Sequence, residues 1–460
     1  MSIVPPKLQR VSKLTITFLV DNNLEWMTKL PPGFTHELQQ HIPHSRKAGT
    51  GEPGAGVPVL DFNDFCCGAH GFSALIETEP VLAIYGGDAT APGGSAEGAL
   101  DPAAHYYTLF DTGPDSLSLV RNIRALQVPI TKIDRVVTSH WHSDHTGGLL
   151  SFLDLRRKCV EDGVTTPPLT SAGADVEGDI HRAQASKTES NPSSPATKEA
   201  GGSVSTCTVD VHPSRPHLRG IAPPPTWKKV LCALPPDPSF DAIEAAGGIV
   251  EKRDDGHTVA GGTVWISGEV PRVTEWEKGL LGGVRWVKEG EDAWRDHATR
   301  KGDLEASSED DVIEPAGEAG TGKWIAEPHI MDERYAVVDV EGKGLVVFSS
   351  CSHAGIVNVI RDAVKTFNRP IYMIVGGLHL ASADLYPRIE PTVKFLSETL
   401  RPAPTYILPM HCTGWKAKIA LEEALGEGVV PAGVGHRVEI IGTKEVEGVD
   451  ARRMWVSIVE

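Results

Sequence analysis

The sequence predicts a mixed α/β fold in which strands supply most of the core. Short runs rich in Val and Ile, each closed by Ser, Gly or Pro, recur along the chain in the manner of buried strands. Stretches with apolar residues three and four apart predict helices at residues 115–128, 356–367 and 388–400. Further strands are expected at residues 14–22, 71–78, 105–113, 257–270, 335–340 and 453–460.

A histidine closes each of four further apolar runs. The runs begin at residues 133, 344, 371 and 405, and the histidines are His140, His353, His379 and His411. Strand ends and the loops beyond them are places where a rigid sheet can position functional groups while leaving them open to solvent. We therefore expect these histidines to mark a functional site.

The length and composition predict one large domain with two insertions. The 460 residues are 40% hydrophobic, which is enough to bury a sizeable core. We expect a single domain over residues 11–460. Residues 156–205 are rich in Ser, Thr, Pro, Gly and Ala, and residues 288–323 are acidic and Gly-rich, so both are expected to be flexible surface insertions.

The charge balance and the cysteines limit the choice of partner and compartment. Lys and Arg number 44 against 61 Asp and Glu, and the formal net charge of -17 disfavours nonspecific binding to nucleic acid or to an anionic membrane. Seven scattered cysteines without paired spacing indicate free thiols in a reducing compartment. No run approaches the roughly 18 apolar residues of a membrane span, and the N-terminus does not resemble a signal peptide. We expect a cytoplasmic protein.

The stretch TSHWHSDHTGG, residues 138–148, crowds three histidines and an aspartate into a few positions. In an extended backbone His140 and His142 point to the same side and can bind one ion. Asp144 and His145 follow at once, where a turn can bring a carboxylate and a third imidazole to a neighbouring position. Imidazole with carboxylate suits zinc, with manganese or iron as alternatives. Two ions that share a hydroxide would form a nucleophile at neutral pH.

These motifs resemble a known family. HWHSDH, residues 140–145, is similar to the His-x-His-x-Asp-His signature of the metallo-β-lactamase superfamily, and TLFDTG resembles its strand-ending aspartate motif, here Asp111. More narrowly, residues 332–360 and the segments GGLHL, GEVPRVTEWE and HCTG resemble 7,8-dihydropterin-6-methyl-4-(β-D-ribofuranosyl)aminobenzene-5'-phosphate synthases and related metal-dependent hydrolases. The resemblance extends from residue 14 to about residue 414, apart from the insertions. It implies an αββα sandwich with the metals at the mouth between two sheets.

The resemblance also implies two divalent metal ions, zinc in the first place, and their ligands. The expected ligands of the first ion are His140, His142 and His353, and those of the second are Asp144, His145 and His411. Asp144 is expected to take part in catalysis as well. Asp111 would lie behind the ligands and fix a ligand ring or the bridging water by a hydrogen bond.

Several further residues are candidates for the site. Many superfamily members have a bridging aspartate where GGLHL places His379, and imidazole cannot bridge two ions as a carboxylate does. His379 is therefore expected either to bind one ion or to act in catalysis, by binding a substrate phosphate or moving a proton. His70, in CCGAHGFS, and Arg272, in GEVPR, are candidates for the substrate pocket, although Arg272 would equally suit a surface ion pair. Cys351 and Cys412 adjoin expected ligands, but neighbouring residues on a strand face opposite ways, so we expect both to pack in the interior.

Three kinds of function remain open from the sequence. The first is a metal-dependent enzyme that acts on an anionic small molecule, phosphorylated or pyrophosphorylated, as the resemblance implies. The second is a metal-dependent hydrolase of a lactone, thioester or phosphodiester. The third is a metal-binding sensor without turnover, against which the complete ligand set argues. The sequence leaves the choice between hydrolysis and condensation, the metal and the oligomeric state open.

Overall fold

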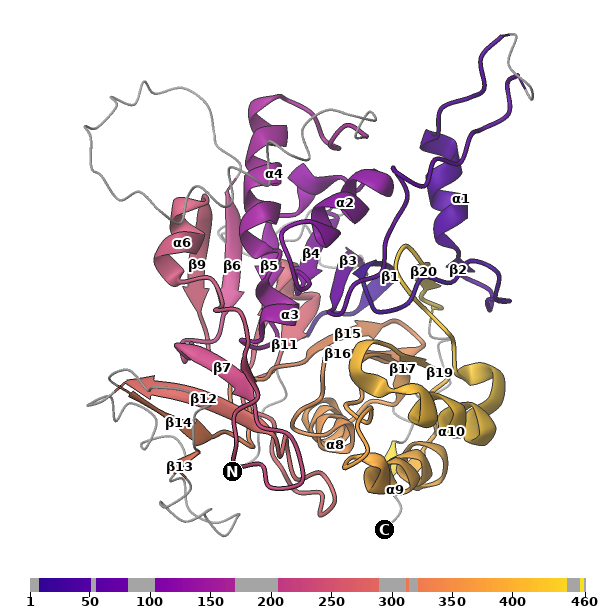
Figure 1. Cartoon of the computed structure of the whole chain (residues 1–460). Helices are drawn as coiled ribbons and strands as arrows, with labels where there is room; N and C mark the ends of the chain where they lie inside the picture. The colour runs from indigo at the N-terminus through magenta and orange to yellow at the C-terminus, as the bar shows by residue number, and fades with distance from the viewer. Residues whose placement is uncertain are drawn as a thin grey trace, which may run out of the picture.

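The computed structural model describes residues 8–50, 55–81, 104–169, 206–288, 312–313, 322–444 and 456–458. These residues form a mixed α/β fold around one large sheet of 14 strands, which confirms the expected fold class. Figure 1 shows helices on both sides of the strands and a separate, smaller sheet beside them.

The first half of the large sheet contains mainly N-terminal strands. In spatial order they are β1 (Val11–Val20), β3 (Ser73–Pro80), β4 (Tyr106–Phe110), β5 (Arg135–Val137), β6 (Cys207–Val211) and β9 (Gly248–Lys252). β1, β3 and β4 pair antiparallel, whereas β4, β5, β6 and β9 run parallel. β1 also pairs with β20 (Arg437–Ile441), which pairs in turn with β2 (Phe34–Thr35).

The second half contains four C-terminal strands. They are β15 (Ala336–Val340), β16 (Gly344–Ser349), β17 (Ile371–Gly376) and β19 (Tyr406–Pro409), and the last three run parallel. A β-hairpin of β10 (His257–Val259) and β11 (Val264–Ile266) pairs with β15. The two halves are joined through β1 and β15 at the single pair Val11 and Val340, so the sheet folds over on itself at this point.

The strand residues alternate between two hydrophobic environments, as the period of a β-strand requires. On β16, Val346 and Phe348 pack in the central core between the two halves, whereas Leu345 and Val347 pack in an outer core. The fully buried apolar side chains each stabilise the fold by about 1.5–3 kcal/mol. This alternation is the physical reason that two sheet faces can pack together while helices cover the other two.

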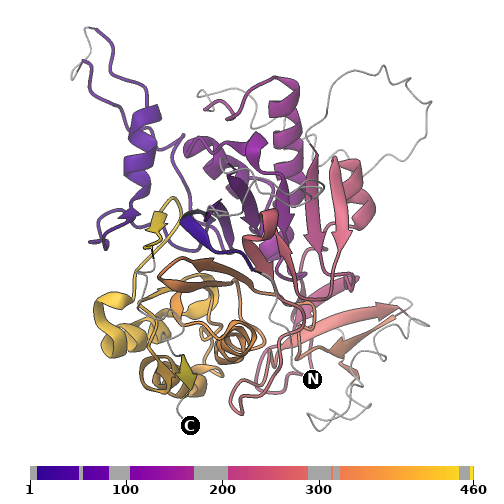
Figure 2. The same cartoon turned by 180° about the vertical axis from the view of Figure 1, so that it is seen from behind.

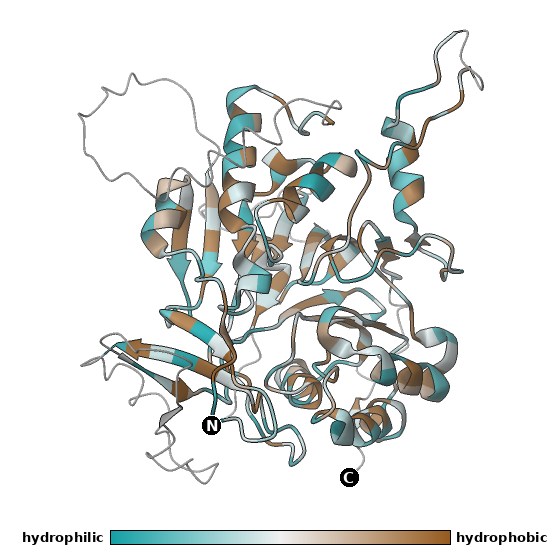
Figure 3. Cartoon of the chain, viewed as in Figure 1, coloured by the Kyte–Doolittle hydropathy of each residue, from teal (hydrophilic) through white to brown (hydrophobic). Residues whose placement is uncertain are grey.

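Helices form the two outer layers of the sandwich. The helices α2 (Ser118–Ala125), α4 (Leu149–Glu161) and α6 (Phe240–Ala245) cover the first half, and α8 (Ile356–Phe367), α9 (Ile389–Lys394) and α10 (Trp415–Leu425) cover the second. Figures 1 and 2 show the two groups from opposite sides, and Figure 3 shows apolar residues along the strands of the large sheet. Apolar side chains of the helices pack against these strands. The order helix, sheet, sheet, helix confirms the αββα sandwich.

The expected helices are close to the observed ones. α8 has the expected bounds, and α2 lies inside the expected range 115–128. α9 ends at Lys394, because residues 395–399 form a π-helical turn before β18 (Leu400–Arg401), which pairs with β21 (Ser457–Ile458). Two short helices, α1 (Glu37–His41) and α3 (Ser143–Thr146), complete the described helices, and none of these described helices has the length and apolar character needed to cross a bilayer.

A second sheet was not predicted from the sequence. It consists of β13 (Val312–Ile313), β14 (Gly322–Ala326), β12 (Gly283–Lys288), β7 (Leu218–Ile221) and β8 (Cys232–Ala233). Its small core contains Ala222, Val230, Val284 and Trp324. β13 and the adjoining ends of β12 and β14 lie within the range 288–323 expected for the acidic insertion, so these positions carry strands.

The boundary expected for the other insertion also needs correction. Residues 156–161 belong to α4, and the buried Arg156 donates from its Nε to the carbonyl of Ile133 at 2.7 Å. The arginine anchors the end of α4 against the loop before β5, so this part is packed structure. The remainder of that expected insertion, residues 170–205, lies outside the described residues, as do residues 289–311 and 314–321.

Candidate metal centre

The ends of six strands meet at one place in the sandwich. Asp111 follows β4, His140 follows β5, and the stretch from Ser350 to His353 follows β16. His379 and His411 follow β17 and β19, and Asp21 follows β1. These strands belong to both halves of the sheet, so the site lies at the mouth between them.

Three imidazole nitrogens converge on one point. His140 Nε2 lies 3.0 Å from His142 Nδ1 and 3.2 Å from His353 Nε2, and the last two nitrogens are 3.1 Å apart. All three side chains are buried. Nitrogens bound to one tetrahedral zinc at about 2.1 Å lie about 3.4 Å apart, so this triangle has nearly the size that such an ion requires.

A second group of donors lies beside the first. Asp144 Oδ2 is 3.2 Å from His411 Nε2 and 3.6 Å from His145 Nε2. The Sγ atom of Cys351 is 3.1 Å from the same nitrogen of His145. Asp144, His145, Cys351 and His411 therefore form a donor set whose atoms all lie within 4.8 Å of one another.

The loop that carries these donors is bent, not extended. The backbone N–H of His142 donates to the carbonyl of His140 at 3.1 Å, so the expectation of an extended backbone is wrong, and the two rings meet across a bend. Trp141 between them is fully buried, and its backbone N–H donates to Asp332. Arg219 of β7 pairs with Asp332 and also donates to the carbonyl of Trp141. The second sheet thus supports the loop that carries the first donors.

Asp111 orients two of the donors. It accepts hydrogen bonds from His145 Nδ1 at 2.8 Å and from the backbone and hydroxyl of Ser139, each at 2.7 Å. The Ser139 hydroxyl also accepts from Ser350 and lies 2.9 Å from His140 Nδ1. Because both rings bond through Nδ1, their Nε2 atoms face the donor groups. The structure therefore brings Asp111 to the position expected for it.

Further supporting residues were not found from the sequence. Both carboxylate oxygens of Glu333 accept backbone N–H groups at 2.7 Å, from His353 and Ala354. Asp21 accepts the backbone N–H of His411 at 2.7 Å, and the amide oxygen of Asn22 accepts from His411 Nδ1 at 3.1 Å. The one signal for Asp21 and Asn22 was their position directly after an apolar run, the same signal that marked the histidines.

Burial determines the protonation of the first donor group. It lowers the pKa of His140, His142 and His353, to about 3 for His142, and neighbouring histidines lower those of His140 and His353 further. These rings are neutral at neutral pH, the form in which imidazole binds a metal. Burial also lowers the pKa of His145, but the carboxylates of Asp144 and Asp111 outweigh it and raise this pKa to about 9.

Strained backbone accompanies the strand ends. Asp111, Ser352, His379 and His411 all have positive φ angles, between 42° and 61°. Residues other than glycine avoid this region, and such strain is concentrated at functional sites. The glycines that follow the histidine motif have a related role, because a Cβ at Gly147 would meet the carbonyl of Pro114.

The remaining candidates lie at different distances from the donors. The ring of His379 is 4.5 Å from that of His353, and neither of its ring nitrogens has a hydrogen-bond partner among the described residues. The exposed His70 places its Nε2 3.8 Å from Asp144 Oδ2, so it lies at the solvent rim. The half-buried Arg272 donates instead to the carbonyls of Val270 and Ile330, so these hydrogen bonds connect it to backbone and not to the donors.

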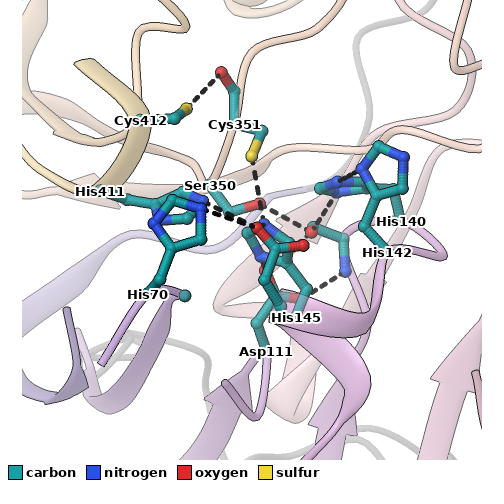
Figure 4. Close-up of polar contacts among 12 residues, drawn as sticks. His70, Asp111, His140, His142, His145, Ser350, Cys351, His411 and Cys412 are labelled. Atoms are coloured by element: carbon teal, nitrogen blue, oxygen red, sulfur yellow. Dashed lines mark hydrogen bonds and ion pairs between the residues drawn. The ribbon is translucent and has the colours of Figure 1, made fainter. Parts of the chain in front are cut away.

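Cys351 is buried in the interior, as expected, and it also contacts a donor. It points toward His145 between the two groups of histidines, whereas the thiol of Cys412 is directed at the carbonyl of Cys351, 3.4 Å away (Figure 4). The buried imidazoles, carboxylate and thiol present lone pairs to one another at distances that fit divalent cations. The residues present therefore fit a metal centre.

The sequence comparisons agree with this chemistry. Residues 104–161 match the model of the metallo-beta-lactamase superfamily. The 7,8-dihydropterin-6-methyl-4-(beta-D-ribofuranosyl)-aminobenzene-5'-phosphate synthase of Methanocaldococcus jannaschii is 34% identical over 98 residues, which is 21% of this chain and 32% of that protein. An uncharacterized protein of the same organism is 32% identical over 100 residues, 22% of this chain and 34% of that protein. The matches thus cover about a third of these curated relatives.

A solved structure is similar over a longer stretch at lower identity. A metal-dependent hydrolase of the beta-lactamase superfamily is 17% identical, covers 93% of this chain and 99% of its own, and has a TM-score of 0.49. The sequence match that includes Asp111 and the whole HWHSDH motif carries the assignment. Over residues 104–161 the chain is similar to the metallo-β-lactamase superfamily.

Proposed function

We propose that this protein is an enzyme with a dinuclear metal centre that acts on a phosphorylated or pyrophosphorylated small molecule. The observation that carries the proposal is the pair of adjacent donor groups. His140, His142 and His353 would hold one ion, and Asp144, His145 and His411 the other. Zinc suits this mixture of imidazole and carboxylate best.

Bound divalent ions supply Lewis acidity and lower the pKa of water into the neutral range. The protein residues would orient the reactants around that chemistry. Asp111 accepts the Nδ1 proton of His145 directly and orients Nδ1 of His140 through the Ser139 hydroxyl. Both Nδ1 protons are thereby directed away from the donor groups. His379, beside His353 and without a hydrogen-bond partner among the described residues, would bind a substrate oxygen or move a proton. His70 at the rim would contact the substrate from the solvent side.

The substrate class is supported by the similarity to the curated relative. The name of that relative describes a synthase whose product carries a 5'-phosphate. Oxygen-rich phosphate groups are suitable partners for a pair of divalent ions. Because the match covers only about a third of that relative, the proposal extends to the class of substrate and not to the named product.

The test is metal analysis followed by a substrate screen. His36, Glu37 and His436 also bring donor atoms within 4.8 Å of one another, so the zinc content is measured in the full chain and in a Glu37→Gln variant. We expect close to two zinc ions per chain in the variant, and turnover of phosphate or pyrophosphate compounds above that of lactones, thioesters and phosphodiesters. A zinc content at or below one would refute the dinuclear centre. Turnover confined to the other three classes would refute the substrate class.

A further inference from the structure

The position of Cys351 connects the two donor groups. Its sulfur belongs to the set with Asp144, His145 and His411, and also to a set with His140 and His353, in each case within 4.8 Å. In Figure 4 the thiol lies between the His411 side and the His140 side of the site. No other described residue is a member of both sets.

The surroundings of this thiol are unlike those of the other buried cysteines. Cys66, Cys159 and Cys207 pack in the hydrophobic core under α2 and α4. Cys351 is only 3% exposed, yet within the described part of the chain it belongs to none of the hydrophobic clusters. Its sulfur makes a polar contact with His145 Nε2 at 3.1 Å. Apolar packing, the usual role of a buried cysteine, does not account for this environment.

The distances also suit a ligand. A tetrahedral zinc with a sulfur at about 2.3 Å and a nitrogen at about 2.1 Å holds these two atoms about 3.6 Å apart. The observed separation between the sulfur of Cys351 and His145 Nε2 is 3.1 Å, so a shift of a few tenths of an ångström would admit an ion.

We propose that Cys351 is a thiolate ligand shared by the two metal positions. The inference rests on the proposed dinuclear centre and names the residue that joins its halves. When the ions bind, the thiol proton is released to solvent and the sulfur donates one lone pair to each ion. A shared thiolate would make the centre prefer zinc, cobalt or iron(II) over manganese or magnesium, because sulfur is a soft ligand.

The first experiment is cobalt(II) titration of the metal-free full chain, followed by visible and near-ultraviolet absorption. We expect visible d–d bands from bound cobalt and a near-ultraviolet thiolate-to-cobalt charge-transfer band that grows through both equivalents. Cys351→Ser should lose the charge-transfer band and keep d–d bands. The matched control is Cys412→Ser, which removes the neighbouring thiol and should keep the charge-transfer band.

The possible results separate this inference from the proposed function. Absence of d–d bands in the wild-type chain would refute the metal centre itself. Presence of d–d bands without a charge-transfer band, or a charge-transfer band that persists in Cys351→Ser or disappears in Cys412→Ser, would refute the role of Cys351 alone.

A second measurement does not depend on the folding of a variant. X-ray absorption of the wild-type zinc protein should give one sulfur neighbour for each zinc if the thiolate is shared. A terminal thiolate would give an average of half a sulfur per zinc, and this result would overturn the bridge. No sulfur in the first shell would overturn ligation.

Discussion

Replacing Asp111 by Asn tests whether this buried carboxylate sets the orientation of the metal ligands. The asparagine oxygen can still accept the backbone N–H of Ser139, but its amide group then faces the Ser139 hydroxyl and His145 Nδ1. The amide NH2, the Ser139 hydroxyl and the protonated Nδ1 of His145 are all hydrogen-bond donors, so the amide group cannot replace the carboxylate as their acceptor. The His145 proton on Nδ1 therefore loses its acceptor, and the tautomer with the proton on Nε2 is favoured. That nitrogen is the one that faces Asp144 and Cys351.

The expected effect is a loss of metal affinity in a folded protein. Removing a partner that orients a ligand usually weakens metal binding by about 10–100-fold, which corresponds to about 1.4–2.8 kcal/mol. Of the two metal-binding steps, the one at the donor group that contains His145 should lose affinity. Competition against a chromophoric chelator measures the affinity of each step, and far-UV circular dichroism checks that the fold persists.

Asp115→Asn is the matched control, because Asp115 lies four residues further along and also makes hydrogen bonds through its carboxylate. It accepts the backbone N–H groups of Leu117 and Ser118 before α2, at 2.7 and 2.8 Å. Because the asparagine oxygen can still accept these N–H groups and asparagine is about as favourable as aspartate at helix starts, the free energy of unfolding should change by less than about 1 kcal/mol and metal affinity should be unchanged. Unchanged affinity in Asp111→Asn, or an equal loss in both variants, would refute the orienting role.

Three further predictions concern catalysis, pH dependence and the insertion. His379→Ala should keep its metal content while turnover of the best substrate falls by roughly 100-fold or more; a parallel loss of metal would make His379 a ligand instead. Burial raises the pKa of Glu277 to about 7 although backbone hydrogen bonds at the start of α8 lower it. The folded state therefore binds this proton more tightly than the unfolded state, and the free energy of unfolding should fall by about 3 kcal/mol between pH 4.5 and 7. Urea unfolding of the chelator-treated protein measures the free energy of unfolding at each pH. In Glu277→Gln this fall with rising pH should be absent, and the same pH dependence in the variant and the wild-type chain would contradict the role of Glu277. Replacing residues 170–205 by a short Gly-Ser linker should change the melting temperature by less than a few degrees, whereas Arg156→Ala should lower it clearly; the reverse order would contradict the packing of α4.

The features that the sequence predicted well depend on local patterns. The apolar runs before His140, His353, His379 and His411 form strands, and the strand ends bring all four histidines to one place. A short strand of three to six residues carries its own signal, because its apolar run and its end are visible in the residues themselves. α8 has its expected bounds for the same reason.

The second sheet was missed because its signal is not local. β7 and β12 carry Arg219 and Arg285, and the pairing between them joins segments more than 60 residues apart. Arg219 is buried only because Asp332 and Glu327 neutralise its charge, and both carboxylates come from a distant part of the chain. A sequence pattern that equates buried with apolar cannot find such a strand.

The direction in which Cys351 points could not be predicted for a different reason. The alternation of side chains predicts opposite faces for neighbouring residues only while the backbone remains a strand. β16 ends at Ser349, and Ser352 has a φ of 60°, so the chain bends between the strand and α8. The bend allows Cys351 and His353 to face the same donors. A rule that is valid within a strand thus fails one or two residues beyond its end, and in this fold that is where the chemistry of the site is concentrated.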